Sequence, residues 1–144
     1  MTISSNIFNS LKEKRILVTG STGFKGSWLC TWLTELGAQV SGFALPPKPG
    51  SPLFNQLRLP DIIDQHNGDI RDYNLIRQVI EKTKPEAIIH LAAQALVRTS
   101  YQEPKETFDT NIGGGVNLLE AVRNCSGVRA VVFITSDKCY KNKE

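Results

Sequence analysis

The sequence has few cysteines, and none is placed for a disulfide or a zinc site. Cys30, Cys125 and Cys139 are an odd number at wide spacing, and no CxxC pair occurs in the 144 residues. Disulfide frameworks and structural zinc sites are typically built from closely spaced, paired cysteines. We therefore expect neither a disulfide nor a bound metal.

Long apolar runs and a targeting segment are lacking as well. Residues 1–14 contain neither the basic start nor the apolar centre of a signal peptide, and no later run is long enough to cross a bilayer. The sequence therefore predicts a soluble cytoplasmic protein in which residues 1–14 form a leader to a single folded domain over residues 15–144.

Charge of one sign is not concentrated in the chain, except for a basic cluster at residues 138–143. The formal net charge is +3, and no aromatic or recognition motif accompanies the basic residues. This is weak support for nucleic-acid binding. A mildly basic surface also suits an anionic small molecule such as a nucleotide diphosphate. We expect a small-molecule ligand, and neither nucleic acid nor a membrane as partner.

Short apolar runs alternate with helical patterns along the chain. Strands are predicted over 15–19, 39–45, 62–66, 87–91 and 130–134, and helices over 27–36, 72–84 and 107–124. The last two strands are continuous apolar runs, typical of strands covered on both faces. Right-handed crossovers then give an α/β, doubly wound parallel sheet of order 3-2-1-4-5, a Rossmann fold truncated after its fifth strand. Trp28 and Trp32, one helical turn apart, are expected in the core.

Thr19 to Gly26, with the sequence TGSTGFKG, places its glycines as GxxGxxG between the first strand and the first helix. Glycine permits the turn and a close approach of the backbone to a pyrophosphate, and the helix N-terminus attracts an anion. A plain strand-to-helix turn is the alternative, but the position in the first βα unit favours a dinucleotide. The candidate cofactor residues are Gly20, Thr22, Gly23, Phe24, Lys25 and Gly26.

Two further segments end strands at the same edge of the predicted sheet. Asp69 is placed to accept from the adenine amino group and Ile70 to cover the ring, although a turn before a helix-capping Asp72 is the alternative. After the fourth strand, small residues allow a nicotinamide ribose to approach the backbone; the candidates there are Leu91, Ala92, Ala93 and Gln94. His90, inside the apolar run, is expected to be a hydrogen-bonded core residue rather than a catalyst.

The acidic residue that often holds the adenosine ribose is absent from the second strand. Residues 41–45 contain neither Asp nor Glu, and Lys48 is the nearest candidate for a 2′-phosphate. The residues themselves therefore leave NAD and NADP open.

These segments resemble the extended short-chain dehydrogenases that act on nucleotide sugars. The shared motifs are residues 19–26, 69–70, 90–93, Asn111 and 135–137. Within that group, residues 23–29, 92–98 and 135–140 are similar to the CDP-glucose 4,6-dehydratases, and the likeness extends from Arg15 over nearly the whole chain. The resemblance implies NAD as cofactor, a nucleotide sugar as substrate, a homodimer paired partly through the helix over 107–124, and a role in deoxysugar biosynthesis for lipopolysaccharide O-antigen.

The resemblance also implies a lyase reaction, in which C4 of the hexose is oxidised, water is eliminated across C5 and C6, and hydride returns to C6. Ser136 would hydrogen-bond the C4 oxygen, and a protonated Asp137 would protonate the departing C6 hydroxyl. Lys138, where dTDP-glucose relatives have glutamate, could remove the C5 proton only as a neutral amine. By composition alone these residues form a polar turn before a basic tail. Asn111 would make a structural hydrogen bond near the fourth strand.

The tyrosine and lysine that the superfamily uses as YxxxK are not found after the fifth strand. Tyr101 and Lys105 have the spacing but precede the long helix. We therefore expect residues 1–144 alone to be inactive, as an incomplete part of a longer enzyme. The alternatives are an epimerase or reductase of the same superfamily and a noncatalytic dinucleotide-binding module. The nucleotide base of the substrate is assigned by resemblance only.

Overall fold

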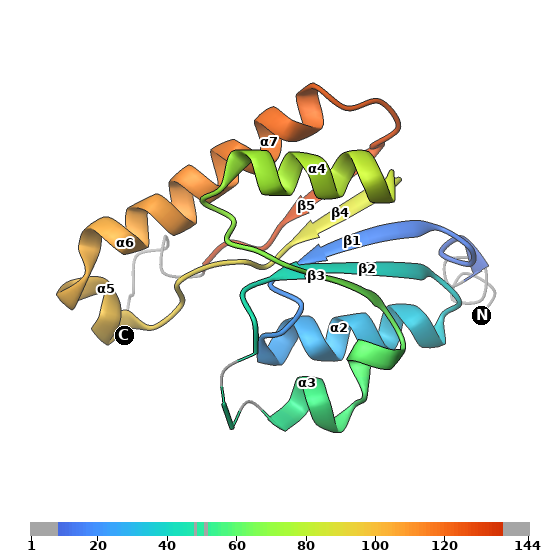
Figure 1. The fold of residues 1–144 in the computed structure, drawn as a ribbon, viewed down its shortest axis with the longest axis horizontal. Helices are drawn as coiled ribbons and strands as arrows, with labels where there is room; N and C mark the ends of the chain where they lie inside the picture. The colour runs from blue at the N-terminus through green and yellow to red at the C-terminus, as the bar shows by residue number, and fades with distance from the viewer. Residues whose placement is uncertain (1–8, 48, 51, 137–144) are drawn as a thin grey trace, which may run out of the picture.

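The computed structural model describes residues 9–47, 49–50 and 52–136, and a five-stranded parallel sheet lies at its centre (Figure 1). The strands are β1 (Arg15–Thr19), β2 (Gln39–Ala44), β3 (Asp64–Asn67), β4 (Ala87–His90) and β5 (Ala130–Phe133). Their order across the sheet is β3-β2-β1-β4-β5. The predicted doubly wound sheet is confirmed, and because all strands are parallel, their carboxyl ends share one edge.

Helices cover both faces of this sheet (Figure 1). α2 (Phe24–Glu35) and α3 (Pro52–Gln56) lie on one face, and α4 (Tyr73–Thr83) and α7 (Gly114–Arg123) lie on the other. Each face buries its own apolar cluster: Ile16, Val18 and Leu33 belong to the first, and Leu17, Ile88 and Leu118 to the second. Leu17 and Val18 are both fully buried because successive strand residues point to opposite faces.

Local sequence signals account for the ends of α4. Asp72 is its N-cap and accepts hydrogen bonds from the backbone N–H groups of Asn74 at 2.9 Å and Leu75 at 3.1 Å, which confirms its predicted capping role. Lys84 ends the helix in a left-handed conformation with φ of 46°, directly before Pro85. The short 3-10 turn η1 (Leu59–Asp61) precedes β3.

The long helix predicted over 107–124 is built from three successive segments. α6 (Pro104–Phe108) leads into the π-helical turn η2 (Asp109–Gly113), which continues into α7. A further short helix, α5 (Val97–Gln102), precedes them and was not predicted. Figure 1 shows α5 and α6 beyond the carboxyl edge of the sheet, where they extend past the strands. These helices therefore border the edge at which ligands bind in such folds.

Two packing expectations are wrong. Trp28 and Trp32 are 52% and 56% exposed, because α2 turns Ser27, Cys30 and Leu33 toward the sheet instead. The prediction that the last strand is covered on both faces also fails, since Val132 is 49% exposed. β5 is the outermost strand of the described sheet, so only β4 pairs with it.

No helix in the described part of the chain is both long and apolar enough to span a membrane. Cys30 and Cys125 are free thiols, and Cys139 lies outside the described residues. Within the described ranges, no group of three or more His, Cys, Asp or Glu side chains is arranged to hold a metal ion.

Candidate functional site

A cavity of about 410 Å³ opens at the carboxyl edge of the sheet, where the segments after β1, β2, β3 and β4 converge. It brings together most of the predicted cofactor residues: Gly20, Thr22, Gly23, Asp69, Ile70, Leu91, Ala92, Ala93 and Gln94. Leu96, Glu106 and Thr110 extend the wall toward α5, α6 and η2. The structure therefore gathers residues that are more than 70 positions apart in the sequence.

The glycine loop between β1 and α2 packs tightly against its surroundings. Gly20 has φ of +74°, and a Cβ there would lie 2.8 Å from the backbone nitrogen of Ala92. A Cβ on Gly26 would lie 2.0 Å from the carbonyl oxygen of Gly20. Both contacts involve backbone, which leaves no room for a side chain. Gly23 caps α2 without a side-chain hydrogen bond, so the helix N-terminus offers backbone N–H groups to an anion.

Of the other predicted cofactor residues in the glycine loop, Thr22 lines the cavity, and Phe24, Lys25 and Gly26 do not. The hydroxyl of Thr22 donates to the carbonyl oxygen of Leu45 at 2.9 Å and so joins the loop to the end of β2. Phe24 and Lys25 are exposed on the first turn of α2 and are not part of the cavity wall. Gly26 also lies outside the wall and contributes through packing on Gly20.

Asp69 contacts both the backbone and the side chain of Arg71 in the turn after β3. Its carboxylate accepts from the backbone nitrogen of Arg71 at 2.9 Å and from Nε at 3.0 Å, and it makes an ion pair with Nη2. The hydrogen bonds from the Arg71 side chain hold the pKa of Asp69 below its usual value. Asp69 is therefore a charged acceptor in the cavity wall at neutral pH.

The hydroxyl of Thr19 connects β1 to the end of β4. Thr19 Oγ1 lies 2.7 Å from Nδ1 of His90 and accepts from the backbone nitrogens of Leu91 and Ala92, each at 3.2 Å. Because those two N–H groups occupy the oxygen lone pairs, the hydroxyl proton is donated to Nδ1. His90 is 4% exposed, which confirms the predicted core histidine. Thr19 was not among the candidate site residues, although a threonine ending a buried strand was a signal for it.

His90 makes stability depend on pH. Burial lowers its pKa from 6.5 to about 4, so the unfolded chain binds a proton more readily than the folded protein. The protein is therefore fully stable at neutral pH. Its stability decreases as the pH falls below 6.5, the pKa of this histidine in the unfolded chain, toward its pKa of about 4 in the folded protein. We expect the free energy of unfolding to drop by about 2 kcal/mol between about pH 7 and about pH 5. Urea unfolding across this range measures it, and a His90→Gln variant should lose most of the slope.

Asn111 fastens the segment that follows β4. Its Oδ1 accepts from the backbone nitrogen of Gln94 at 2.8 Å, and its Nδ2 donates to the carbonyl oxygen of Gln94 at 3.1 Å, which confirms the expected structural role. The Gln94 amide contacts the backbone nitrogen of Leu96 at 2.7 Å and the hydroxyl of Thr107 at 3.0 Å. Gln94 thus lines the cavity while its side chain holds the entry to α5.

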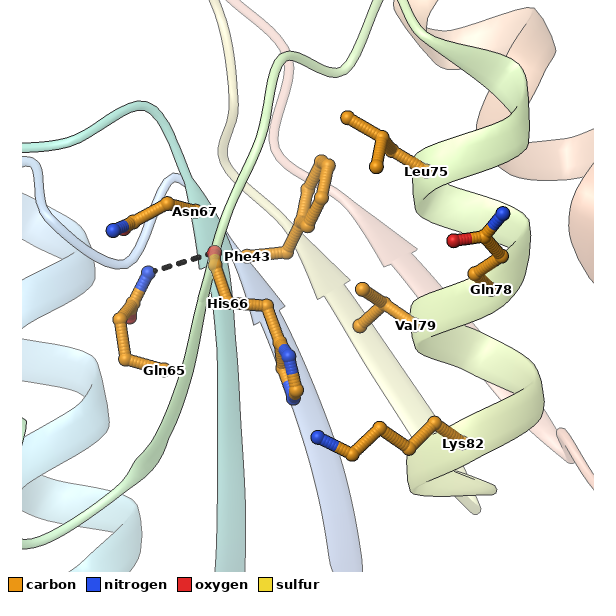
Figure 2. A pocket seen from close by; sticks show the side chains of 8 residues that line it. All are labelled: Phe43, Gln65, His66, Asn67, Leu75, Gln78, Val79 and Lys82. Atoms are coloured by element: carbon orange, nitrogen blue, oxygen red, sulfur yellow. Dashed lines mark hydrogen bonds between the residues drawn. The ribbon is translucent and has the colours of Figure 1, made fainter.

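A second hollow, of about 340 Å³, lies between β3 and α4 and shares only Phe43 with the first. Figure 2 shows His66 on the β3 side of this hollow and Leu75, Val79 and Lys82 on the α4 side. The glycine loop does not reach this hollow. We therefore place the candidate dinucleotide site in the cavity at the carboxyl edge.

Comparison with known proteins identifies the family. Residues 17–142 match the family model for GDP-mannose 4,6 dehydratase. The chain belongs to this family. It is 53% identical in sequence to CDP-glucose 4,6-dehydratase of Salmonella typhimurium, over 94% of this chain and 38% of that protein. It is 32% identical to CDP-paratose 2-epimerase of Salmonella typhi, over 90% of this chain and 39% of that protein.

Solved structures support the observed fold. UDP-glucose-4-epimerase from Stenotrophomonas maltophila, with bound NAD and formylated UDP-arabinopyranose, superposes with a TM-score of 0.80 at 28% identity, over 91% of this chain and 39% of that one. The UDP-glucose 4-epimerase of Thermus thermophilus, in complex with NAD, gives 0.73 at 33% identity, over 83% and 36%. The chain thus spans about two fifths of the length of the relatives it matches.

The predicted catalytic residues of this family member follow β5. Ser136 is exposed at the end of the described chain. Asp137 and Lys138 lie outside the described residues, so their roles stay predictions. Ser136 comes after the carboxyl end of β5. Because β5 is parallel to β4, this end lies at the same edge of the sheet as the cavity.

Proposed function

We propose that the chain is the cofactor-binding part of an NAD-dependent nucleotide-sugar 4,6-dehydratase, a lyase that converts CDP-glucose to CDP-4-keto-6-deoxyglucose. The observation that carries this proposal is the 53% identity to a CDP-glucose 4,6-dehydratase over nearly the whole chain. The nucleotide base and the NAD preference rest on this likeness and on the NAD complexes of the fold neighbours.

The cavity fits a dinucleotide in four respects. Gly20 and Gly23 line the cavity, and the N-terminus of α2 supplies backbone N–H donors for a pyrophosphate. Asp69, after β3, offers an acceptor for the adenine amino group, and Leu91 to Ala93, after β4, add small or apolar wall residues.

A dinucleotide that carries hypoxanthine in place of adenine lacks the adenine amino group and should bind more weakly than NAD. Equal affinities would remove Asp69 from adenine recognition.

When bound, NAD would supply the hydride acceptor and donor for C4 and C6. Ser136 would hydrogen-bond the C4 oxygen, and a protonated Asp137 would give its proton to the leaving C6 hydroxyl. The proton of the C4 hydroxyl would leave to the tyrosine of the superfamily's YxxxK pair, which is not found after β5 in residues 1–144. Lys138 takes the C5 proton, which the C4 ketone acidifies, and it does so as a neutral amine. This proposal extends the sequence prediction for these three positions.

The Lys138→Ala variant of the complete protein is expected to lose most exchange of the C5 proton with solvent, because the proposed base is gone. General-base catalysis contributes about 100-fold or more to such a step. NMR detection of deuterium at C5 measures the exchange rate. Lys12→Ala, an exposed lysine that precedes β1 and does not line the cavity, is the control and should leave it unchanged. An undiminished exchange rate in Lys138→Ala would assign the base to another group.

A homodimer is also proposed, through one apolar face of α6, η2 and α7. Phe108, Ile112, Val116 and Leu119 recur at helical spacing and are 63%, 57%, 59% and 51% exposed. Leu118 and Ala121 point into the core, so this row lies on a different side of the helix. An apolar row of this kind suits an interface between copies. Sedimentation of the complete protein as a monomer at micromolar concentration would contradict the proposal.

An epimerase of the same superfamily is the second candidate, because the superposed structures with bound NAD are UDP-glucose 4-epimerases. The two functions differ in product mass: an epimerase leaves the mass of the sugar nucleotide unchanged, and a dehydratase removes one water.

A further inference from the structure

Asn117, on the inner side of α7, binds the turn that carries Asp69. Its Nδ2 donates to the carbonyl oxygen of Arg71 at 2.8 Å and to that of Ile70 at 3.2 Å. The side chain therefore spans two consecutive peptide groups more than 40 positions earlier in the sequence. An amide NH₂ group has two donor hydrogens, which matches two carbonyl acceptors.

The same helix also fixes the side chain inside that turn. Ile70 is 4% exposed, and a Cβ added to Gly114 would lie 2.6 Å from its Cγ2. Gly114 thus lets α7 approach Ile70 closely, while Asn117 holds the carbonyl oxygens of the two peptide groups that flank Arg71. With the carbonyl oxygens of Ile70 and Arg71 held by α7, the turn has little freedom to rotate. The Asp69 carboxylate, held by Arg71, is left in the cavity wall.

We propose that Asn117 is a positioning residue for the adenine side of the dinucleotide cofactor, acting through the backbone of Ile70 and Arg71 on the orientation of Asp69. The inference rests on the proposed cofactor site and adds to it a residue that does not line the cavity. The contact also connects cofactor binding to α7, whose outer side carries part of the proposed dimer face.

The test is the Asn117→Asp variant of the complete protein, titrated with NAD, ADP-ribose and nicotinamide mononucleotide. The substitution keeps the size of the side chain but removes both donors and places a carboxylate against two carbonyl oxygens. We expect NAD and ADP-ribose to bind at least about tenfold more weakly. Each lost hydrogen bond is expected to lower the binding constant by about half to one order of magnitude. Nicotinamide mononucleotide should bind as in the unsubstituted protein.

Asn74→Asp is the matched control. Asn74 is exposed on the first turn of α4, next to the same turn, and does not line the cavity. It adds the same charge near Asp69 without disturbing the carbonyl oxygens of Ile70 and Arg71, so its NAD affinity should equal that of the unsubstituted protein. If Asn117→Asp does not fold, Asn117→Ala removes the donors without a new charge and should show the same selective loss.

Three results would overturn the proposal. One is unchanged NAD affinity of the folded Asn117 variant. Together with a lower melting temperature, this result would show that Asn117 stabilises the fold and does not position the cofactor site. Another is equal weakening of ADP-ribose and nicotinamide mononucleotide, which indicates general damage to the cavity. The third is equal weakening in Asn74→Asp, which indicates a charge effect. If the unsubstituted protein binds no dinucleotide at all, the proposed function fails first and this inference with it.

Discussion

Replacing Gly26 with alanine is expected to abolish dinucleotide binding and to destabilise the fold by about 3 kcal/mol, the upper range for an overpacked site. The added Cβ would lie 2.0 Å from the carbonyl oxygen of Gly20 and 2.9 Å from the Cα of Ser21. These are backbone atoms of the same loop, so relief requires α2 to move away from β1 or the loop to open. Either movement displaces the N-terminus of α2 from the cavity. Urea unfolding and calorimetric titration with NAD measure the two effects.

Gly113→Ala is the control for this prediction. A Cβ at Gly113 meets no atom within 4 Å, and the residue is helical with φ of −58°. Alanine there should keep NAD affinity and raise the free energy of unfolding by up to about 1 kcal/mol, because glycine is the poorer helix former. If Gly26→Ala bound NAD like Gly113→Ala, the close packing of the loop would have no part in binding.

Replacing Thr19 with valine is the second large effect we expect. Valine has nearly the same shape but lacks the hydroxyl that donates to His90 and accepts from the backbone N–H groups of Leu91 and Ala92. His90 is buried and the two N–H groups are partly buried, and each buried group left without a partner costs about 1–3 kcal/mol. We therefore expect the free energy of unfolding to fall by about 2–4 kcal/mol, since Leu91 keeps a second bond to the Thr19 carbonyl oxygen. NAD affinity should fall too, because Ala92 lines the cavity.

Thr34→Val provides the comparison. The Thr34 hydroxyl donates to the carbonyl oxygen of Cys30 within α2, a bond of 2.9 Å that remote segments do not depend on. Its loss should change stability by less than about 1 kcal/mol and leave NAD affinity unaltered. Equal losses in the two variants, by urea unfolding, would show that the Thr19 hydroxyl does not hold β4 to β1.

The strand order and the glycine loop could be predicted from the sequence because their signals are local. The β1 run, the GxxGxxG spacing and the Asp72 cap are each formed by residues only a few positions apart. Parallel strands joined by right-handed crossovers leave few topologies. The carboxyl edge of the sheet then follows, and with it most of the cavity wall.

The contacts that hold this wall together were not predictable in the same way. Asn117 and the carbonyl oxygen of Ile70 are brought together only by the packing of α7 on the sheet, and the helical pattern gives no sign of this contact. The exposure of Trp28 and Trp32 was missed for a related reason. Which side of α2 faces the sheet is decided by the small residues Gly26, Ser27 and Cys30, and apolar spacing alone pointed to the tryptophans.

The most direct test of the proposed function follows the substrate. The complete protein is incubated with NAD and CDP-glucose, and the sugar nucleotide is examined by mass spectrometry. Our proposal predicts a product lighter by one water, formed without net consumption of NAD. CDP-glucose of unchanged mass, together with dTDP-, UDP- and GDP-hexoses of unchanged mass, would contradict the dehydratase and leave an epimerase or a noncatalytic dinucleotide-binding fold.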